Sequence, residues 1–161
     1  MKFLTHWLID VPERLSRVFL WLPPLFARIV VGWVFMWSGW EKLHALPQIT
    51  ANFVSWGIPF PGFTTPFVSG VEFFGGLFLL LGLFTRIAGV PLVIVMIVAI
   101  ISAKWDQVDS LETLLGFEEV SYMALFGWLA VAGPGPISLD YLLQKFQGTS
   151  EPAFAPSKMA S

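Results

Sequence analysis

Long apolar runs, separated by short polar or proline-containing segments, dominate the chain. A helix needs roughly 20 apolar residues to cross a hydrocarbon core of about 30 Å. Runs of that length are typical of membrane-spanning helices rather than of a soluble core. We therefore predict an all-α membrane protein built as a four-helix transmembrane bundle. The expected spans cover about residues 25–45, 65–84, 87–105 and 113–133.

The last apolar run is too short to span on its own. Its uncharged part, residues 120–132, would form a helix only about 20 Å long. A spanning helix must therefore begin near Thr113. That start draws Glu118 and Glu119 into the membrane, so we expect carboxylates inside the fourth span.

Three segments lie outside these spans. Residues 1–23 mix apolar and charged positions at roughly helical spacing, which indicates an amphipathic helix on the membrane surface. A partly ordered tail is the alternative. Residues 46–66 carry no charge, several prolines and four aromatic side chains, and are expected to form a loop that lies against the membrane or covers the helices as a lid. The polar segment 143–161 is expected to be a disordered cytoplasmic tail.

The positive charges predict an orientation. With four spans, one side of the membrane holds both termini and the turn near Arg86, together with seven of the nine Lys and Arg residues. The other side has only Lys42 and Lys104. Because an excess of Lys and Arg faces the cytoplasm, we predict a multi-pass membrane protein with both termini cytoplasmic.

Composition narrows the chemistry. Only 12% of the residues are charged, about half the share of a soluble domain. The absence of cysteine excludes disulfides, thiol relays and covalent haem attachment. With His6 and His44 as the chain's histidines, we predict no metal site and no built-in cofactor. A redox role would need a diffusible or bound organic cofactor, or a partner subunit. No basic run suggests nucleic acid.

Charged residues fall at one depth in the predicted bundle. Glu72 lies about 10 Å below the outer end of the second span, and Glu119 lies at a similar depth in the fourth. Lys42 and Lys104 lie within a turn of the outer ends of the first and third spans. Two acids and two bases are thus expected to meet in the outer half of the bundle, where their charges can cancel.

Two interpretations of this cluster remain open. The charges could simply pair to fix helix register, or the lysines could extend to the membrane surface. Alternatively, they could form a polar pocket for the headgroup of a lipophilic substrate such as a quinone, with a carboxylate relaying a proton. No catalytic residue is identified. The candidate substrate-binding residues are Glu72, Glu119, Lys42, Lys104, Ser38, Tyr122 and Trp37.

Several short motifs, in order, resemble those of the DoxX family of small bacterial membrane proteins. The resemblance covers roughly residues 24–142. The motifs are Arg28-Ile29-Val30-Val31-Gly32, Ser38-Gly39-Trp40-Glu41-Lys42-Leu43, Glu72-Phe73-Phe74-Gly75-Gly76, Gly82-Leu83-Phe84-Thr85-Arg86, Gly133-Pro134-Gly135 and Ser138-Leu139-Asp140.

The resemblance implies a four-span domain of the bacterial inner membrane that is linked to respiratory or oxidative-stress oxidoreductase systems. Relatives include a subunit of a terminal quinol oxidase that also acts in thiosulfate:quinone oxidoreduction. Relatives that use disulfide chemistry have cysteines that this chain lacks. We expect a quinone-interacting or scaffolding component, at most a subunit of an enzyme, whose partners are the lipid bilayer and a redox protein. A homo-oligomer is left open. The alternatives are a small-molecule transporter that uses the same charges and a purely structural membrane adaptor.

Overall fold

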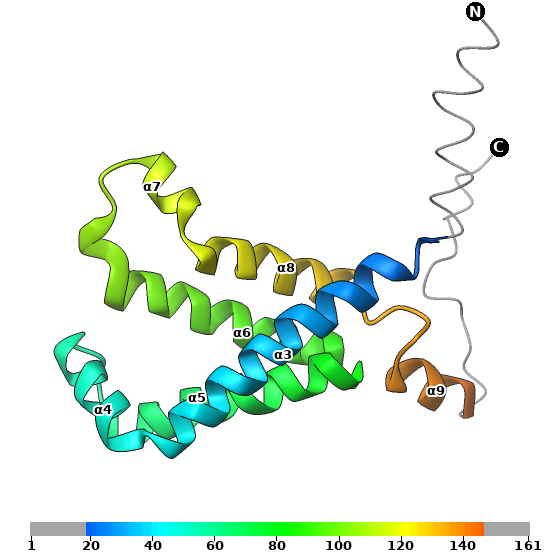
Figure 1. The fold of residues 1–161 in the computed structure, drawn as a ribbon, viewed down its shortest axis with the longest axis horizontal. Coiled ribbons are helices and arrows are strands. Elements are labelled where there is room, and N and C mark those ends of the chain that lie inside the picture. The colour runs from blue at the N-terminus through cyan, green and yellow to red at the C-terminus, as the bar shows by residue number, and fades with distance from the viewer. Residues whose placement is uncertain (1–18, 147–161) are drawn as a thin grey trace, which may run out of the picture.

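The computed structural model describes residues 19–146, whose regular elements are all helices (Figure 1). This confirms the predicted all-α fold class. Most of the expected interfacial helix at 1–23 lies outside the described residues. The elements are α3 (Leu22–His44), α4 (Leu46–Ser55), α5 (Pro61–Leu81), α6 (Thr85–Ala99), a π-helix (Ile100–Lys104), a 3-10 helix (Trp105–Gln107), α7 (Leu111–Gly116), α8 (Glu118–Ala132) and α9 (Leu139–Phe146).

Within the described residues, three helical segments are long and apolar enough to cross a membrane. They are Leu22–His44, Pro61–Leu81 and Thr85–Gln107. The fourth, α8, has 15 residues, or about 22 Å at 1.5 Å per residue. The described chain begins and ends at the same end of the bundle, where α3 starts and α9 lies (Figure 1). The turns that carry α4 and α7 lie at the opposite end.

The expectation of one continuous fourth helix from Thr113 is wrong. The helix breaks at Phe117, whose backbone is extended with φ −70° and ψ 135°. The break follows Gly116, and glycine has a low helix propensity. Glu118 and Glu119 therefore form the first turn of α8, where the positive end of the helix dipole favours acidic side chains.

Two segments expected to lack regular structure contain helices. In 46–66, α4 begins at Leu46 and accommodates Pro47 in its first turn, where a backbone N–H would have no partner within the helix. This helix ends before Gly57, which has φ +69°. At the other end of the chain, α9 runs to Phe146. The expected disordered tail therefore cannot begin at 143, and residues 147–161 lie outside the described part of the chain.

Glycines bring the helices together in two antiparallel pairs, α3 with α5 and α6 with α8. A β carbon on Gly32 would lie 2.8 Å from the Leu80 amide nitrogen, so only glycine permits this approach of α3 to α5. Likewise, a β carbon on Gly89 of α6 would lie 2.8 Å from the Phe126 carbonyl oxygen in α8. The two pairs diverge toward the end that carries α4 and α7 (Figure 1).

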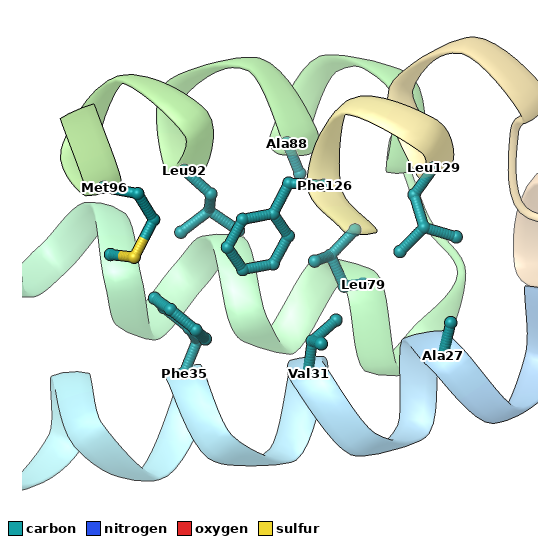
Figure 2. Close-up of a cluster of buried hydrophobic side chains, with 9 residues drawn as sticks. All are labelled: Ala27, Val31, Phe35, Leu79, Ala88, Leu92, Met96, Phe126 and Leu129. Atoms are coloured by element: carbon teal, nitrogen blue, oxygen red, sulfur yellow. The ribbon is translucent and has the colours of Figure 1, made fainter. Parts of the chain in front are cut away.

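The apolar core fills the other half of the bundle. Phe126 of α8 is fully buried and points between the side chains of α6 and α3 (Figure 2). It makes an edge-to-face contact with Phe35, at a ring separation of 4.8 Å, a favourable geometry for aromatic pairs. The core comprises Ala27, Val31, Phe35, Leu79, Ala88, Leu92, Met96, Phe126 and Leu129.

Candidate functional site

One ion pair joins α3 to α5. Lys42 Nζ lies 2.7 Å and 2.6 Å from the two carboxylate oxygens of Glu72, and Ser38 Oγ donates to the same carboxylate at 3.3 Å. The Glu72 side chain is 3% exposed, whereas that of Lys42 is 33% exposed. A buried carboxylate is tolerated when it is paired and hydrogen-bonded. Glu72 therefore has a cation and a hydroxyl as partners.

A second ion pair joins the end of α6 to α8. Lys104 Nζ lies 2.6 Å and 2.8 Å from the two oxygens of Glu119. It also lies 5.2 Å from the centre of the Phe117 ring, at the break before α8. Lys104 is the last residue of the π-helix Ile100–Lys104. Such a turn redirects side chains relative to a regular helix and is frequent at functional sites.

A cavity of about 940 Å³ lies between the two pairs of helices. Both ion pairs line it, together with four hydroxyl-bearing residues, Ser38, Thr64, Ser102 and Tyr122. Most of the remaining wall is apolar and comes from α3, α5 and α6. The volume is within the range of small-molecule sites, which are typically apolar with a few convergent polar groups.

The structure brings together six of the seven candidate residues from the sequence. Glu72, Glu119, Lys42, Lys104, Ser38 and Tyr122 all line the cavity. Trp37 does not line the cavity, so its predicted place in the pocket is wrong. Its side chain is half-exposed, stacks on Trp33 and donates to Glu41 at 2.8 Å. Neighbouring residues of a helix point about 100° apart, so Trp37 cannot share the direction of Ser38.

Sequence reasoning did not identify which residues of the segment between α3 and α5 line the cavity. Phe53 of α4 is buried and lines the cavity, and Trp56 and Ile58 follow it in the wall. The aromatic content of this uncharged segment was the signal, and the expectation that it covers the helices agrees with this placement. Its individual cavity residues could not be chosen without knowing that residues 46–55 are helical.

The cavity offers both hydrogen-bond donors and hydrogen-bond acceptors within a largely apolar wall. Each ion pair is neutral as a whole, and the further carboxylate of Glu118 at the cavity wall is exposed. Lysine can donate to a ligand oxygen, a carboxylate can accept from a ligand hydroxyl, and Ser38 and Tyr122 can do either. An uncharged ligand with a small polar head fits this arrangement best, because a charged one would compete with the existing pairs.

Between residues 19 and 146, Arg28 is the buried charged residue besides Glu72, and it lies near the opposite end of the bundle. The sequence places it one turn into the first span, from which arginine often extends to the headgroups. Instead it is 1% exposed, and its Nη2 donates to the Ile137 carbonyl at 2.5 Å. Nearby, the Asp140 carboxylate accepts from the backbone N–H groups of Phe84 and Thr85, at 2.9 Å and 3.3 Å. The segment before α9 thus closes this end of the bundle.

Comparison with known proteins agrees with the predicted family. The family model described as DoxX matches residues 24–105, a range that includes both residues of the Lys42–Glu72 pair and Lys104. No solved structure matches the chain.

Three curated relatives match most of the chain. Inner membrane protein YqjF of Escherichia coli is 29% identical over 121 residues, which are 75% of this chain and 92% of the relative. Uncharacterized membrane protein Rv3486 of Mycobacterium tuberculosis is 36% identical over 129 residues, 73% of this chain and 79% of the relative. The protein named "Putative oxidoreductase CatD" of Bacillus subtilis is 30% identical over 118 residues, which are 72% of this chain and 83% of the relative. The chain therefore belongs to the DoxX family of membrane proteins.

Proposed function

We propose that this protein is a membrane component of an oxidoreductase system and binds a quinone in the cavity between its two helix pairs. The observation that carries the proposal is that two ion pairs and four hydroxyl-bearing residues, Ser38 and Tyr122 among them, line one largely apolar cavity of about 940 Å³. The name of the relative CatD, which refers to an oxidoreductase, supports the same direction.

A quinone suits the chemistry of the wall. Its two carbonyl oxygens accept hydrogen bonds, which Lys42 and Lys104 can donate while they remain near their carboxylates. The reduced quinol donates through hydroxyl groups, which Glu72 and Glu119 can accept. Because the chain has no cysteine, electron transfer would involve a partner protein rather than a thiol of this subunit.

Quinone binding to the purified protein tests the proposal directly. We expect decylubiquinone to bind the wild-type protein in detergent, and Glu72→Gln to weaken that binding at least about tenfold, the effect of about 1.4 kcal/mol. The matched control is Glu41→Gln. Glu41 lies next to Lys42 in sequence but is exposed, accepts from Trp37 and does not line the cavity.

A second variant keeps the test valid if Glu72→Gln does not fold. Tyr122→Phe removes only the hydroxyl of a cavity residue, and the aromatic contact of its ring with Phe35 is retained. Weakened binding in this variant, with wild-type thermal stability, supports the site. Wild-type affinity in both cavity variants would overturn it, and so would equal loss in the Glu41→Gln control.

A transporter remains the alternative function. In a proteoliposome flux assay, a flux that Glu72→Gln abolishes would favour it. The described conformation favours binding over permeation. Phe126, Leu79 and Leu92 are fully buried and fill the bundle between the cavity and the end that holds the turn from α5 to α6. A permeating solute would have to displace this core.

We also propose that both termini face the cytoplasm, in a bacterial inner membrane. The described chain begins and ends at one end of the bundle (Figure 1). Of the described Lys and Arg residues, Arg28, Arg86 and Lys145 lie toward that end, and Lys42 and Lys104 lie toward the other, a difference that favours the cytoplasm for the first end. The native chain has no cysteine, so a single introduced thiol reports its own location. In intact cells, a membrane-impermeant maleimide should label Asp109→Cys but not Gln144→Cys, which lies on α9. Labelling in the reverse pattern would refute the orientation.

A further inference from the structure

We propose that the cavity opens sideways between α5 and α6, and that its ligand enters from the bilayer with an apolar tail lying between these two helices. This inference rests on the proposed function and extends it. It assigns the ligand to a chemical class, an uncharged amphiphile with a small polar head and a long hydrocarbon or isoprenoid tail.

Exposed apolar side chains form both sides of this opening. Phe67 of α5 is 58% exposed, and Ile94 and Val98 of α6 are 54% and 42% exposed, yet all three line the cavity. A lining residue that is also exposed marks a place where the cavity reaches the surface. Val34 of α3 and Trp56 after α4 are exposed lining residues too, at 39% and 42%. The gap between α5 and α6 differs because apolar lining residues are exposed on both of its helices, whereas the exposed lining residue of α8 is Glu118. We call Phe67, Ile94 and Val98 the lateral opening.

The helical hairpin brings the two sides of the lateral opening to one level. Phe67 lies fourteen residues before Leu81, the end of α5, and Val98 lies thirteen residues after Thr85, the start of α6. Because the helices are antiparallel and joined by a short turn, both positions lie about 20 Å from that turn. This height is within the hydrocarbon core rather than at its surface.

The polar end of the cavity lies close to this opening. Glu72 follows Phe67 by five residues on α5, about 8 Å along the helix axis. Val68 and Val71, which also line the cavity, lie between them in sequence. A ligand whose head contacts Glu72 and Lys42 would therefore place the start of its tail beside Phe67 and Val98.

The surroundings of the opening select against charged or fully polar ligands. Its three side chains are apolar, and a charged group on this route would lose its hydration within the hydrocarbon core. An apolar tail, by contrast, exchanges lipid contacts for contacts with these side chains at little cost. The polar head then contacts ion pairs that have no net charge, so the ligand needs no charge of its own.

Photo-crosslinking at two neighbouring positions tests the route. We would replace Val98, which lines the cavity, or Ile97, which does not, by benzoylphenylalanine. Ile97 is 41% exposed, almost the same as Val98, so the two positions match in exposure. The purified protein is illuminated with decylubiquinone, and adducts are measured by intact mass spectrometry.

We expect several-fold more decylubiquinone adduct at position 98 than at position 97. Adding Glu72→Gln should remove the excess at position 98 and leave position 97 unchanged. Duroquinone, which has a similar ring but no tail, should compete for the head site and reduce the adduct at position 98.

The outcomes separate the two proposals. If decylubiquinone binds in a Glu72-dependent way but positions 98 and 97 give equal adduct, the lateral route is wrong and the quinone site stands. If binding itself is absent or independent of Glu72, the proposed function fails first. An excess at position 98 that persists with Glu72→Gln would mean nonspecific detergent or lipid partition, and would also overturn the lateral route.

Discussion

Gly39 of α3 lies directly against the main chain of Phe73 in α5. The three atoms nearest to a β carbon built on Gly39 are the amide nitrogen, α carbon and β carbon of Phe73. Phe73 follows Glu72, and Gly39 precedes Lys42 by about one turn. This close contact between two helices therefore sets the distance across which Lys42 and Glu72 pair.

The first prediction concerns this contact. Gly39→Ala should lower the free energy of unfolding by about 1–3 kcal/mol, because the added methyl group can be accommodated only by separating α3 from α5. It should also weaken quinone binding, since separation lengthens the Lys42–Glu72 pair. Thermal unfolding followed by tryptophan fluorescence in micelles measures the first effect.

The matched control lies in α5. A β carbon on Gly70 would meet no atom within 4 Å, so Gly70→Ala should leave stability unchanged or raise it by about 0.5–1 kcal/mol. If both substitutions lower the unfolding temperature equally, the helix contact at Gly39 does not explain the loss.

The second prediction compares the two ion pairs. Lys42→Met leaves the Glu72 carboxylate, 3% exposed, without its cation. Removing one partner of a buried pair costs about 3–5 kcal/mol, and we expect about 2–3 because Lys42 itself is one-third exposed. Lys104→Met should cost less, since the Glu119 side chain is 12% exposed.

A double substitution completes this comparison. Lys42→Met together with Glu72→Met removes both charges and should recover most of the stability lost in the single variant, measured as a coupling free energy. A larger loss for Lys104→Met than for Lys42→Met, or no recovery in the double variant, would contradict the assignment of Glu72 as the more deeply buried acid.

The third prediction concerns the opposite end of the bundle. Asp140→Ala removes the acceptor for the N–H groups of Phe84 and Thr85 at the start of α6. The loss of such a cap should cost about 1–2 kcal/mol of unfolding free energy. Asp106, an exposed acid between α6 and α7, gives the control, and Asp106→Ala should stay within about 0.5 kcal/mol of wild type. Equal effects of the two substitutions would rule out the capping role.

The fourth prediction is a pH effect outside the spans. A hydrogen bond from the Thr113 side chain holds the pKa of the Asp109 carboxyl below its ordinary value, and the backbone N–H of Asp109 itself acts in the same direction. Because the folded pKa is lowered, the local stabilisation is present above the ordinary carboxyl pKa. It is lost as the pH falls through the folded value.

Carbon-13 NMR of the labelled Asp109 carboxyl during a pH titration measures this shift. Thr113→Val should return the pKa toward its ordinary value, whereas Thr113→Ser, which keeps a hydroxyl, should retain the shift. An identical titration in the wild-type protein and the Val variant would show that Thr113 is not the cause.

Local hydrophobicity and helix spacing determined much of this molecule. They located the three long spans, because the cost of placing polar groups in hydrocarbon makes an uninterrupted apolar run informative by itself. Counting residues along the helices also placed Lys42, Lys104 and Glu119 toward one end of the bundle. Glu72 lies deeper than the sequence indicated, because α5 begins at Pro61 and Glu72 is its twelfth residue.

Tertiary structure decided what depends on partners distant in sequence or on local breaks. The sequence could not choose which acid meets which lysine. The close approach of α3 to α5 at Gly39, and the break at Phe117 beside Lys104, set the two pairs. Nor could it reveal that Arg28 donates to Ile137, 109 residues away. Such contacts form only when the helices pack. The sequence gives the direction of a side chain around its helix axis, but its contact partner depends on which helix lies on that side.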